Sequence, residues 1–166
     1  MLAVIAVIAL TATDWRQQWR GLRLAALAEA PEAFGSTLAD WTGDGDTADR
    51  WRARLSSVPF NAIITCDGTP AGMVGATTVN DDSAINDGAV ELLSMWVSPE
   101  FRGRGNGDAP VRAVVNWARV HFPGRAVVLS VKAANHRAVA LYARQGFVEV
   151  GPSPDSADET PMRPRS

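Results

Sequence analysis

The sequence feature that most restricts the fold of this chain is a glycine-rich turn, RGRGNG at residues 102–107. The turn follows an apolar run that ends at residues 94–97, and it precedes a run at residues 111–120 with helical spacing. Glycine lets a ligand approach the backbone without a Cβ in the way. The unpaired N–H groups and the dipole at the start of a helix attract phosphate. A strand, a glycine turn and a helix in this order therefore predict a cradle for a phosphate group.

Two arginines of the turn, Arg102 and Arg104, add positive charge and can form forked hydrogen bonds to phosphate oxygens. Two common phosphate loops do not fit the sequence. A Walker A loop needs lysine and then serine or threonine after its last glycine, but Asp108 and Ala109 follow Gly107 here. A dinucleotide fingerprint reads G-x-G-x-x-G, whereas this turn reads G-x-G-x-G. From these six residues alone, a turn that only reverses the chain direction stays open as the alternative.

The apolar N-terminal run, MLAVIAVIAL, predicts a buried first strand because β-branched residues dominate it. Those residues are Val4, Ile5, Val7 and Ile8. The run is too short to span a bilayer, and neither a basic segment nor a cleavage pattern typical of a secretory signal accompanies it. We therefore expect the run to belong to the folded domain.

Helical spacing begins after this strand, at Asp14. Apolar residues recur at positions 15, 19, 22 and 27, with Thr13 or Asp14 placed to cap the helix and Pro31 placed to interrupt it. A second helix is predicted over residues 48–55, after the loop GDGD at residues 43–46. Four of the six tryptophans fall in this half, and we expect them to anchor the core rather than to bind a ligand. They are Trp15, Trp19, Trp41 and Trp51.

The remaining runs predict further strands and two more helices. The strands are expected at residues 61–66, 71–79, 89–97, 126–131 and 147–150, with a short edge strand at residues 161–163. The first two of these form a hairpin through an Asp-Gly turn. One helix follows the glycine turn, and another opens at Asn135 and closes at Gly146. This order predicts the α/β class, a mixed sheet flanked by helices, in a single domain over residues 1–166.

Charge and cysteine usage exclude several partner classes. The chain has 16 lysines and arginines against 18 aspartates and glutamates, so we expect no broad basic surface for nucleic acid. Its one cysteine, Cys66, cannot form an internal disulfide, and no metal-ligand spacing surrounds it. We therefore predict a cytoplasmic protein that uses no metal and has neither a nucleic-acid nor a membrane partner.

Two segments carry a resemblance to a known family. Residues 92–107, LLSMWVSPEFRGRGNG, combine an apolar strand, a Val-x-Pro step and the pattern Arg-x-x-Gly-x-Gly. Residues 135–147, NHRAVALYARQGF, follow after one predicted helix and one predicted strand. These segments resemble the two signature motifs of the GCN5-related N-acetyltransferases, and residues 14–35 resemble the first-helix region of bacterial members. The resemblance implies a central mixed, mostly antiparallel sheet with a splayed parallel strand pair, flanked by helices.

The resemblance also implies acetyl-CoA as cosubstrate. Its pyrophosphate would lie on the turn, which consists of Arg102, Gly103, Arg104, Gly105, Asn106 and Gly107. Its pantetheine arm would pair with the end of the preceding strand, which consists of Met95, Trp96 and Val97. Asn135 would hydrogen-bond the pantetheine, and Asp108 would have to point away from the diphosphate.

Three groups would carry out the chemistry that the resemblance implies. Tyr142 would protonate the sulfur as the thiolate leaves, and since Asn135 precedes it by seven residues, both would lie on one helix face. Glu91 occupies the place of the base in histone-acetylating members; the alternatives are an ion pair with an arginine and ordered water as the base. A backbone N–H near Trp96 would bind the oxyanion if a bulge turns it inward. A core tyrosine is the alternative role for Tyr142.

The expected function is acetyl transfer from acetyl-CoA to a primary amine of a small molecule or peptide, by direct attack. The alternatives are an acyl-CoA-binding sensor or interaction module without turnover, and a nucleotide-binding regulator. The acceptor is not specified, because acidic loops can either attract a cationic amine or be solvated. The residues concerned are Asp44, Asp46, Asp81, Asp82 and Asp87. The sequence does not fix the oligomeric state, and a homodimer is compatible with it.

Overall fold

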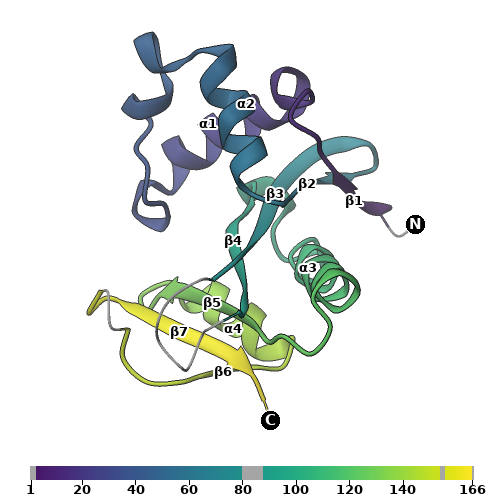
Figure 1. Ribbon diagram of the computed structural model, residues 1–166, viewed down its shortest axis with the longest axis vertical. Coiled ribbons are helices and arrows are strands. Elements are labelled where there is room, and N and C mark those ends of the chain that lie inside the picture. Colours follow the sequence, from purple (N-terminus) through teal and green to yellow (C-terminus); the bar gives the residue numbers. More distant parts are fainter. Residues whose placement is uncertain (1–2, 80–87, 154–155, 166) are drawn as a thin grey trace.

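The computed structural model describes residues 3–79, 88–153 and 156–165, which form a sheet with helices packed on both faces (Figure 1). The helices are α1 (Arg20–Glu29), α2 (Ala48–Ser57), α3 (Asp108–His121) and α4 (His136–Arg144). The strands are β1 (Ile5–Ala9), β2 (Phe60–Cys66), β3 (Thr69–Thr78), β4 (Val90–Val97), β5 (Val127–Lys132), β6 (Phe147–Glu149) and β7 (Glu159–Pro164). The predicted order of strands and helices, and with it the α/β class, is confirmed.

The strands of the described residues form one sheet in the order β1-β2-β3-β4-β5-β7-β6. Neighbouring strands are antiparallel except β4 and β5, which run parallel. Their pairing extends only over Val90 with Val127 and Glu91 with Val128, after which the two strands separate. In Figure 1, β4 leads from the half that carries α1 and α2 to the half formed by β5, β7 and β6. The expected splayed parallel pair is therefore confirmed.

Two hydrophobic cores lie on opposite faces of the sheet. Alternate residues of one strand serve different cores: Ala62 belongs to the core under α3 and α4, and its neighbour Ile63 belongs to the core under α1 and α2. The second core contains the four tryptophans of the N-terminal half, which are at most 7% exposed. Trp41 and Trp51 pack with their ring centroids 4.5 Å apart. The prediction that these tryptophans anchor the core is confirmed.

Two predictions about the edges of the sheet are wrong. The N-terminal run is an edge strand with β2 as its one neighbour, and Val4 and Ile8 are 68% and 43% exposed rather than buried. The short strand expected at the edge is β7, which lies between β5 and β6 and buries Met162 to 1% exposure. After α4 the chain first forms β6 at the outer edge of the sheet, and it then returns to form β7 between β6 and β5.

The first helical segment also begins differently from the prediction. Trp15–Trp19 form one turn of π-helix ahead of α1. Neither Thr13 nor Asp14 caps this turn, because both side chains hydrogen-bond Thr11 instead. The start of α2 is capped by Thr47, whose hydroxyl accepts a hydrogen bond from a backbone N–H of the first turn at 3.3 Å.

Candidate functional site

A cleft of about 770 Å³ lies where β4 and β5 separate. Its walls are the end of β4, the glycine turn, α4 and the C-terminal end of α1. The lining includes most residues that the sequence marked as cofactor-binding: Met95, Trp96, Val97, Arg102, Gly103, Gly105, Gly107, Asn135 and Tyr142. The fold thus brings two motifs that are separated in the sequence to one cavity.

The glycines of the turn meet two different requirements. Gly103 and Gly105 have φ angles of 78° and 77°, in the left-handed region that favours glycine. Gly107 has an ordinary φ of −81°, but an added Cβ there would lie 2.9 Å from Leu141 Cδ2. The first two glycines therefore shape the turn, and the third lets the start of α3 pack closely against α4.

Two turn residues that were predicted to hold the cofactor direct their side chains elsewhere. The Arg104 side chain is exposed, and Arg104 does not line the cleft. Asn106 is 1% exposed, and its Nδ2 donates a hydrogen bond to Phe101 O at 2.7 Å. Asn106 therefore stabilises the turn from within, and neither of these two side chains lines the cleft.

The sequence predicted that the Arg102 guanidinium would be available to fork onto phosphate oxygens. In the structure it is instead bound within the protein. Its Nη1 and Nη2 donate to the Glu29 carboxylate of α1 at 3.2 and 2.7 Å, and its Nε donates to Val97 O at 2.9 Å. Trp96 Nε1 donates to the same carboxylate at 2.9 Å. The hydrogen bonds from Arg102 and Trp96 hold the pKa of Glu29 below its usual range. Arg102 therefore ties the glycine turn and β4 to α1.

Three cations of the cleft wall were missed at the sequence level: Lys132, Arg137 and Arg144. Arg144 donates to the Asp108 carboxylate at 3.1 Å, so this carboxylate faces α4, and Asp108 does not line the cleft. Lys132 pairs with Asp158 at 3.2 Å. Arg137 forms no ion pair within the described ranges. Both arginines belong to the second motif and stand seven residues apart, a spacing that predicts a shared helix face.

A bulge interrupts β4 beside the cleft. Between the pairs of Leu93 and Trp96 with β3, β4 advances three residues and β3 only two, so Ser94 is an extra residue with a φ of 55°. Beyond the bulge, Ser98 N–H donates to a β3 carbonyl at 2.7 Å. Because successive residues of a strand alternate in direction, the N–H of Val97 points to the open edge of β4. The bulge expected near Trp96 is therefore present, two residues before it.

Two predicted residues of α4 face the cleft together. Tyr142 is 5% exposed and packs edge-on against Phe147, with ring centroids 6.2 Å apart. Burial raises the pKa of its hydroxyl well above the usual value, so the hydroxyl keeps its proton. Asn135 caps α4 by accepting a hydrogen bond from Ala138 N–H at 3.2 Å. Gly146, with a φ of 91°, follows the helix end as predicted.

Glu91 is not brought into the same cavity as Tyr142. It pairs with Val128 at the last position before β4 and β5 separate, and it is partly buried. It does not line the cleft. Within the described ranges, no three His, Cys, Asp or Glu side chains are grouped so that they could hold a metal ion.

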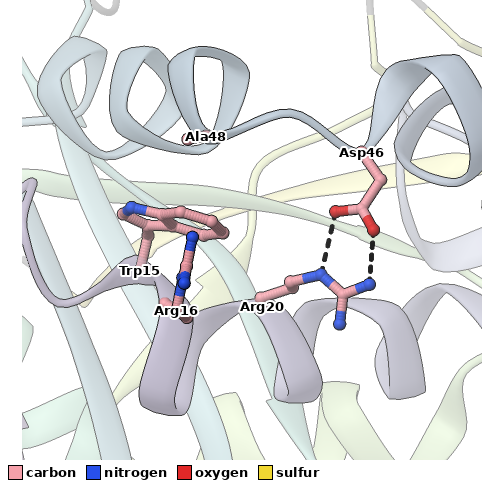
Figure 2. A pocket seen from close by; sticks show the side chains of 5 residues that line it. All are labelled: Trp15, Arg16, Arg20, Asp46 and Ala48. Carbon is pink, nitrogen blue, oxygen red and sulfur yellow. Dashed lines mark hydrogen bonds and ion pairs between the residues drawn. The ribbon is translucent and has the colours of Figure 1, made fainter.

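The acidic loop before α2 is engaged in packing. Figure 2 shows the Asp46 carboxylate facing the Arg20 guanidinium beside a pocket of about 360 Å³. Arg20 Nε and Trp51 Nε1 both donate to Asp46 Oδ1 at 2.8 Å, which holds the pKa of Asp46 below its usual range. Asp44 is exposed. The other acidic residues considered above, Asp81, Asp82 and Asp87, lie outside the described residues.

Comparison with known families and relatives agrees with the geometry of the cleft. Residues 14–147 match the Acetyltransferase (GNAT) family. The chain is 37% identical over 91 residues to N-acetylaspartate synthetase from Homo sapiens, which covers 55% of this chain and 28% of that protein. It is 32% identical over 136 residues to mycothiol acetyltransferase from Corynebacterium glutamicum, which covers 82% of this chain and 37% of that protein. The chain therefore spans less than half the length of these curated relatives.

Solved structures share the fold at low sequence identity. The yncA protein from Salmonella typhimurium, solved with its cofactor acetyl-CoA, aligns with a TM-score of 0.72 at 18% identity, covering 96% of this chain and 92% of that one. RimL, a ribosomal L7/L12 alpha-N-protein acetyltransferase solved in complex with coenzyme A, aligns with a TM-score of 0.70 at 16% identity and the same coverage.

Proposed function

This chain belongs to the GNAT acetyltransferase family, and from that membership we propose that it transfers the acetyl group of acetyl-CoA to a primary amine by direct attack. The observation that carries the proposal is the cleft between β4 and β5, which places the glycine turn and Tyr142 on one cavity. The relatives are named for different products, so their names do not select an acceptor for this chain.

The residues of the cleft fit an elongated anionic cosubstrate. The backbone amides of the cleft-lining glycines Gly103, Gly105 and Gly107 would bind its diphosphate, whereas the Arg102 N–H donates to Pro99 O. Because Arg102 is held by Glu29 and Arg144 by Asp108, we assign the long-range attraction of the phosphates chiefly to Arg137 at the cleft wall. The open edge of β4, with the N–H of Val97, is placed to pair with the amides of the pantetheine arm.

The chemistry requires an unprotonated amine, a stabilised oxyanion and a protonated leaving group. Aliphatic amines have a pKa of about 10.4, so a base must take the proton before attack. We assign that role to Glu91 acting through ordered water, because Glu91 does not line the cleft that holds Tyr142. The amine nitrogen then forms a bond to the acetyl carbonyl carbon, and a backbone N–H near the bulge stabilises the oxyanion. As the carbon–sulfur bond breaks, Tyr142 gives its proton to the sulfur and regains one from solvent.

Two measurements test this function. Calorimetric titration should show that coenzyme A binds the protein, and a thiol assay should show release of free coenzyme A from acetyl-CoA when one amine of a broad panel is present. If coenzyme A does not bind, the proposal is wrong. If it binds but no amine releases thiol, the chain is the acyl-CoA-binding module without turnover.

Three further expectations belong to this proposal. The single, buried Cys66 and the near balance of charges lead us to propose a cytoplasmic location without a nucleic-acid or membrane partner. In the part of the chain that the structure describes, no helix has both the length and the apolar character needed to cross a membrane. A homodimer stays a prediction, which analytical ultracentrifugation tests.

A further inference from the structure

Two arginines from different helices meet at one serine inside the protein. Arg23 of α1 is 5% exposed, and its Nη1 lies 3.3 Å from Ser94 Oγ. Arg54 of α2 is half-buried, and its Nη2 donates to the same oxygen at 3.0 Å. Arg54 Nη1 also donates to Asn61 Oδ1 at 3.2 Å. Two positive charges therefore converge on the bulge of β4.

Among the described residues, no acidic side chain pairs with either of these two charges. Within residues 3–79, 88–153 and 156–165, no carboxylate forms an ion pair with Arg23 or Arg54, and the Nε of Arg23 is buried without a hydrogen-bond partner. Their guanidinium groups lie over aromatic rings instead, Arg23 over Phe34 at 4.9 Å and Arg54 over Trp19 at 5.4 Å. A ring face attracts a cation but does not neutralise its charge.

Other arginines of the same region show the usual arrangement. Arg20, one turn before Arg23 on α1, pairs with Asp46, and Arg102 pairs with Glu29. Both of these pairs are more accessible to solvent than Arg23. Arg20 and Arg102 therefore have carboxylate partners while the more buried Arg23 has none among the described residues, although buried charges are those that most need a partner.

The buried pair remains charged at neutral pH. Burial and the neighbouring charge of Arg54 lower the pKa of Arg23 to about 10, which is still far above neutrality. Burial also lowers the pKa of Arg54. A single carboxylate between the two guanidiniums would have two oxygens to accept their hydrogen bonds. Ser94 can take part as well, because its hydroxyl accepts from both arginines and still has a proton to donate.

The position of the pair relates it to the cleft. Ser94 precedes Met95, which lines the cleft, and an extended residue advances the chain by about 3.3 Å. Arg23, Arg54 and Ser94 do not themselves line the cleft, so a carboxylate bound at Ser94 would lie beside the cleft wall at Met95, with the amine of a small amino acid directed toward the cleft. Ser94 also has a φ of 55°, an unfavourable conformation for a residue other than glycine, and such strain is found preferentially at functional sites.

We propose that Arg23, Arg54 and Ser94 bind the carboxylate of the acceptor, and that the acceptor is therefore an amino acid. This inference rests on the proposed acetyl transfer and names the substrate class for it. The aromatic rings of Phe34 and Trp19 hold the two guanidiniums in place, and the bound carboxylate supplies the negative charge that no described residue places there.

The test compares carboxylates with amides. The common L-amino acids are assayed with acetyl-CoA, each beside its α-carboxamide, in the wild type and in Arg23→Met and Arg54→Met. Arg52→Met is the matched control, since Arg52 is an exposed arginine of α2 whose ion pair with Asp49 is on the surface. Binding of the same compounds to the coenzyme A complex is measured by calorimetry, which does not depend on turnover.

We expect the wild type to prefer the best amino acid over its amide by about 10- to 100-fold in kcat/KM. This is the usual contribution of hydrogen bonds to a charged group. Arg23→Met and Arg54→Met should remove this preference through the KM of the acceptor, with the KM of acetyl-CoA unchanged. Arg23→Met should not melt at a lower temperature than the wild type, because it removes a buried cation that no described acid balances, whereas Arg54→Met also removes the donor to the buried Asn61 Oδ1 and should melt lower. Arg52→Met should retain the preference.

Several outcomes would overturn the inference. The inference is wrong if amides, or amines without a carboxylate, react as well as the amino acids. It is also wrong if the preference for the acid over the amide survives in both Arg23→Met and Arg54→Met. Absence of any amino-acid binding to the coenzyme A complex would also refute it, whereas a failure to bind coenzyme A refutes the acetyl-transfer function itself. A lower melting temperature with an unchanged acid-to-amide ratio would assign the two arginines a structural role.

Discussion

The hydroxyl of Tyr142 keeps its proton because burial raises its pKa well above the usual value. We therefore expect Tyr142→Phe to lower kcat by about 10- to 100-fold, which is at or below the usual contribution of a positioned acid. Affinity for coenzyme A should be retained, since the ring still packs against Phe147. Single-turnover kinetics measure the chemical step. Because the folded-state pKa is raised, Tyr142 should cause no loss of activity between about pH 6 and pH 9.

A substrate change separates the acid role from a packing role. An acetyl thioester with a more acidic thiol leaves without help from a proton donor, so the difference between wild type and Tyr142→Phe should shrink with it. Equal turnover of both proteins with acetyl-CoA, when chemistry limits the rate, would show that Tyr142 only packs.

The Glu29 carboxylate gives a pH-dependent contribution to stability. Hydrogen bonds from Arg102 and then Trp96 lower its pKa in the folded state. A lowered folded-state pKa means that the contribution is full above the unfolded-state pKa and is lost as the pH falls through the folded-state value. We expect Glu29→Gln to melt about 2–4 °C below the wild type at pH 7. Calorimetric scans should show this difference disappear at the acidic end, and a constant difference would contradict the assignment.

At the scale of elements, the glycine turn depends on the distance between α3 and α4. A Cβ at Gly107 would lie 2.9 Å from Leu141 Cδ2, so Gly107→Ala should displace the cleft face of α4. Overpacking of this kind costs about 1–3 kcal/mol, and we expect a matching loss of coenzyme A affinity in a calorimetric titration. Gly21→Ala is a control, because Gly21 has neither a positive φ nor a neighbouring atom within 4 Å.

A double-variant comparison tests the cause. In a Leu141→Ala background the crowding atoms are gone, so the additional effect of Gly107→Ala on coenzyme A affinity should become small. An effect of the same size in both backgrounds would mean that Gly107 acts through the backbone of the turn instead.

The helices and strands that depend on local patterns were predictable from the sequence. The neighbours of each strand and the ion-pair partners of side chains were less so. Alternating apolar residues, the Asn135 cap and Gly146 predict β-strands and α4 because each signal acts within a few residues. The place of β7 between β5 and β6 depends on contacts distant in sequence, which a local pattern does not contain. For the same reason the sequence did not show that Glu29 neutralises Arg102.

The sequence predicted those cleft residues that belong to the two motifs. Gly103, Gly105, Asn135 and Tyr142 line it because the turn and α4 have the expected local geometry. The Asn106 side chain could not be placed from the sequence, since its burial depends on how the turn folds back on Phe101.

For the molecule as a whole, β7 joins the C-terminal strands to the core under α3 and α4. Met162 is 1% exposed and belongs to that core. We expect Met162→Ala to lower the free energy of unfolding by about 2–5 kcal/mol, as for other large-to-small core substitutions. Val150→Ala is the control, since Val150 is 45% exposed. Urea unfolding measures both, and equal effects would contradict the central placement of β7.

The short β4–β5 pairing has a mechanical consequence. Among the described residues, only two residue pairs connect β4 to β5 within the sheet. They join two parts of the sheet, which we call plates: one consists of β1 to β4, and the other consists of β5, β7 and β6. Resistance to bending should therefore be lowest along the junction between β4 and β5. In hydrogen–deuterium exchange without ligand, we expect the amides of the second plate to open as a separate cooperative unit. A molecule that pairs with β4 and also contacts α4 spans both plates, so coenzyme A should slow exchange in the two plates together and make the domain unfold as a single body.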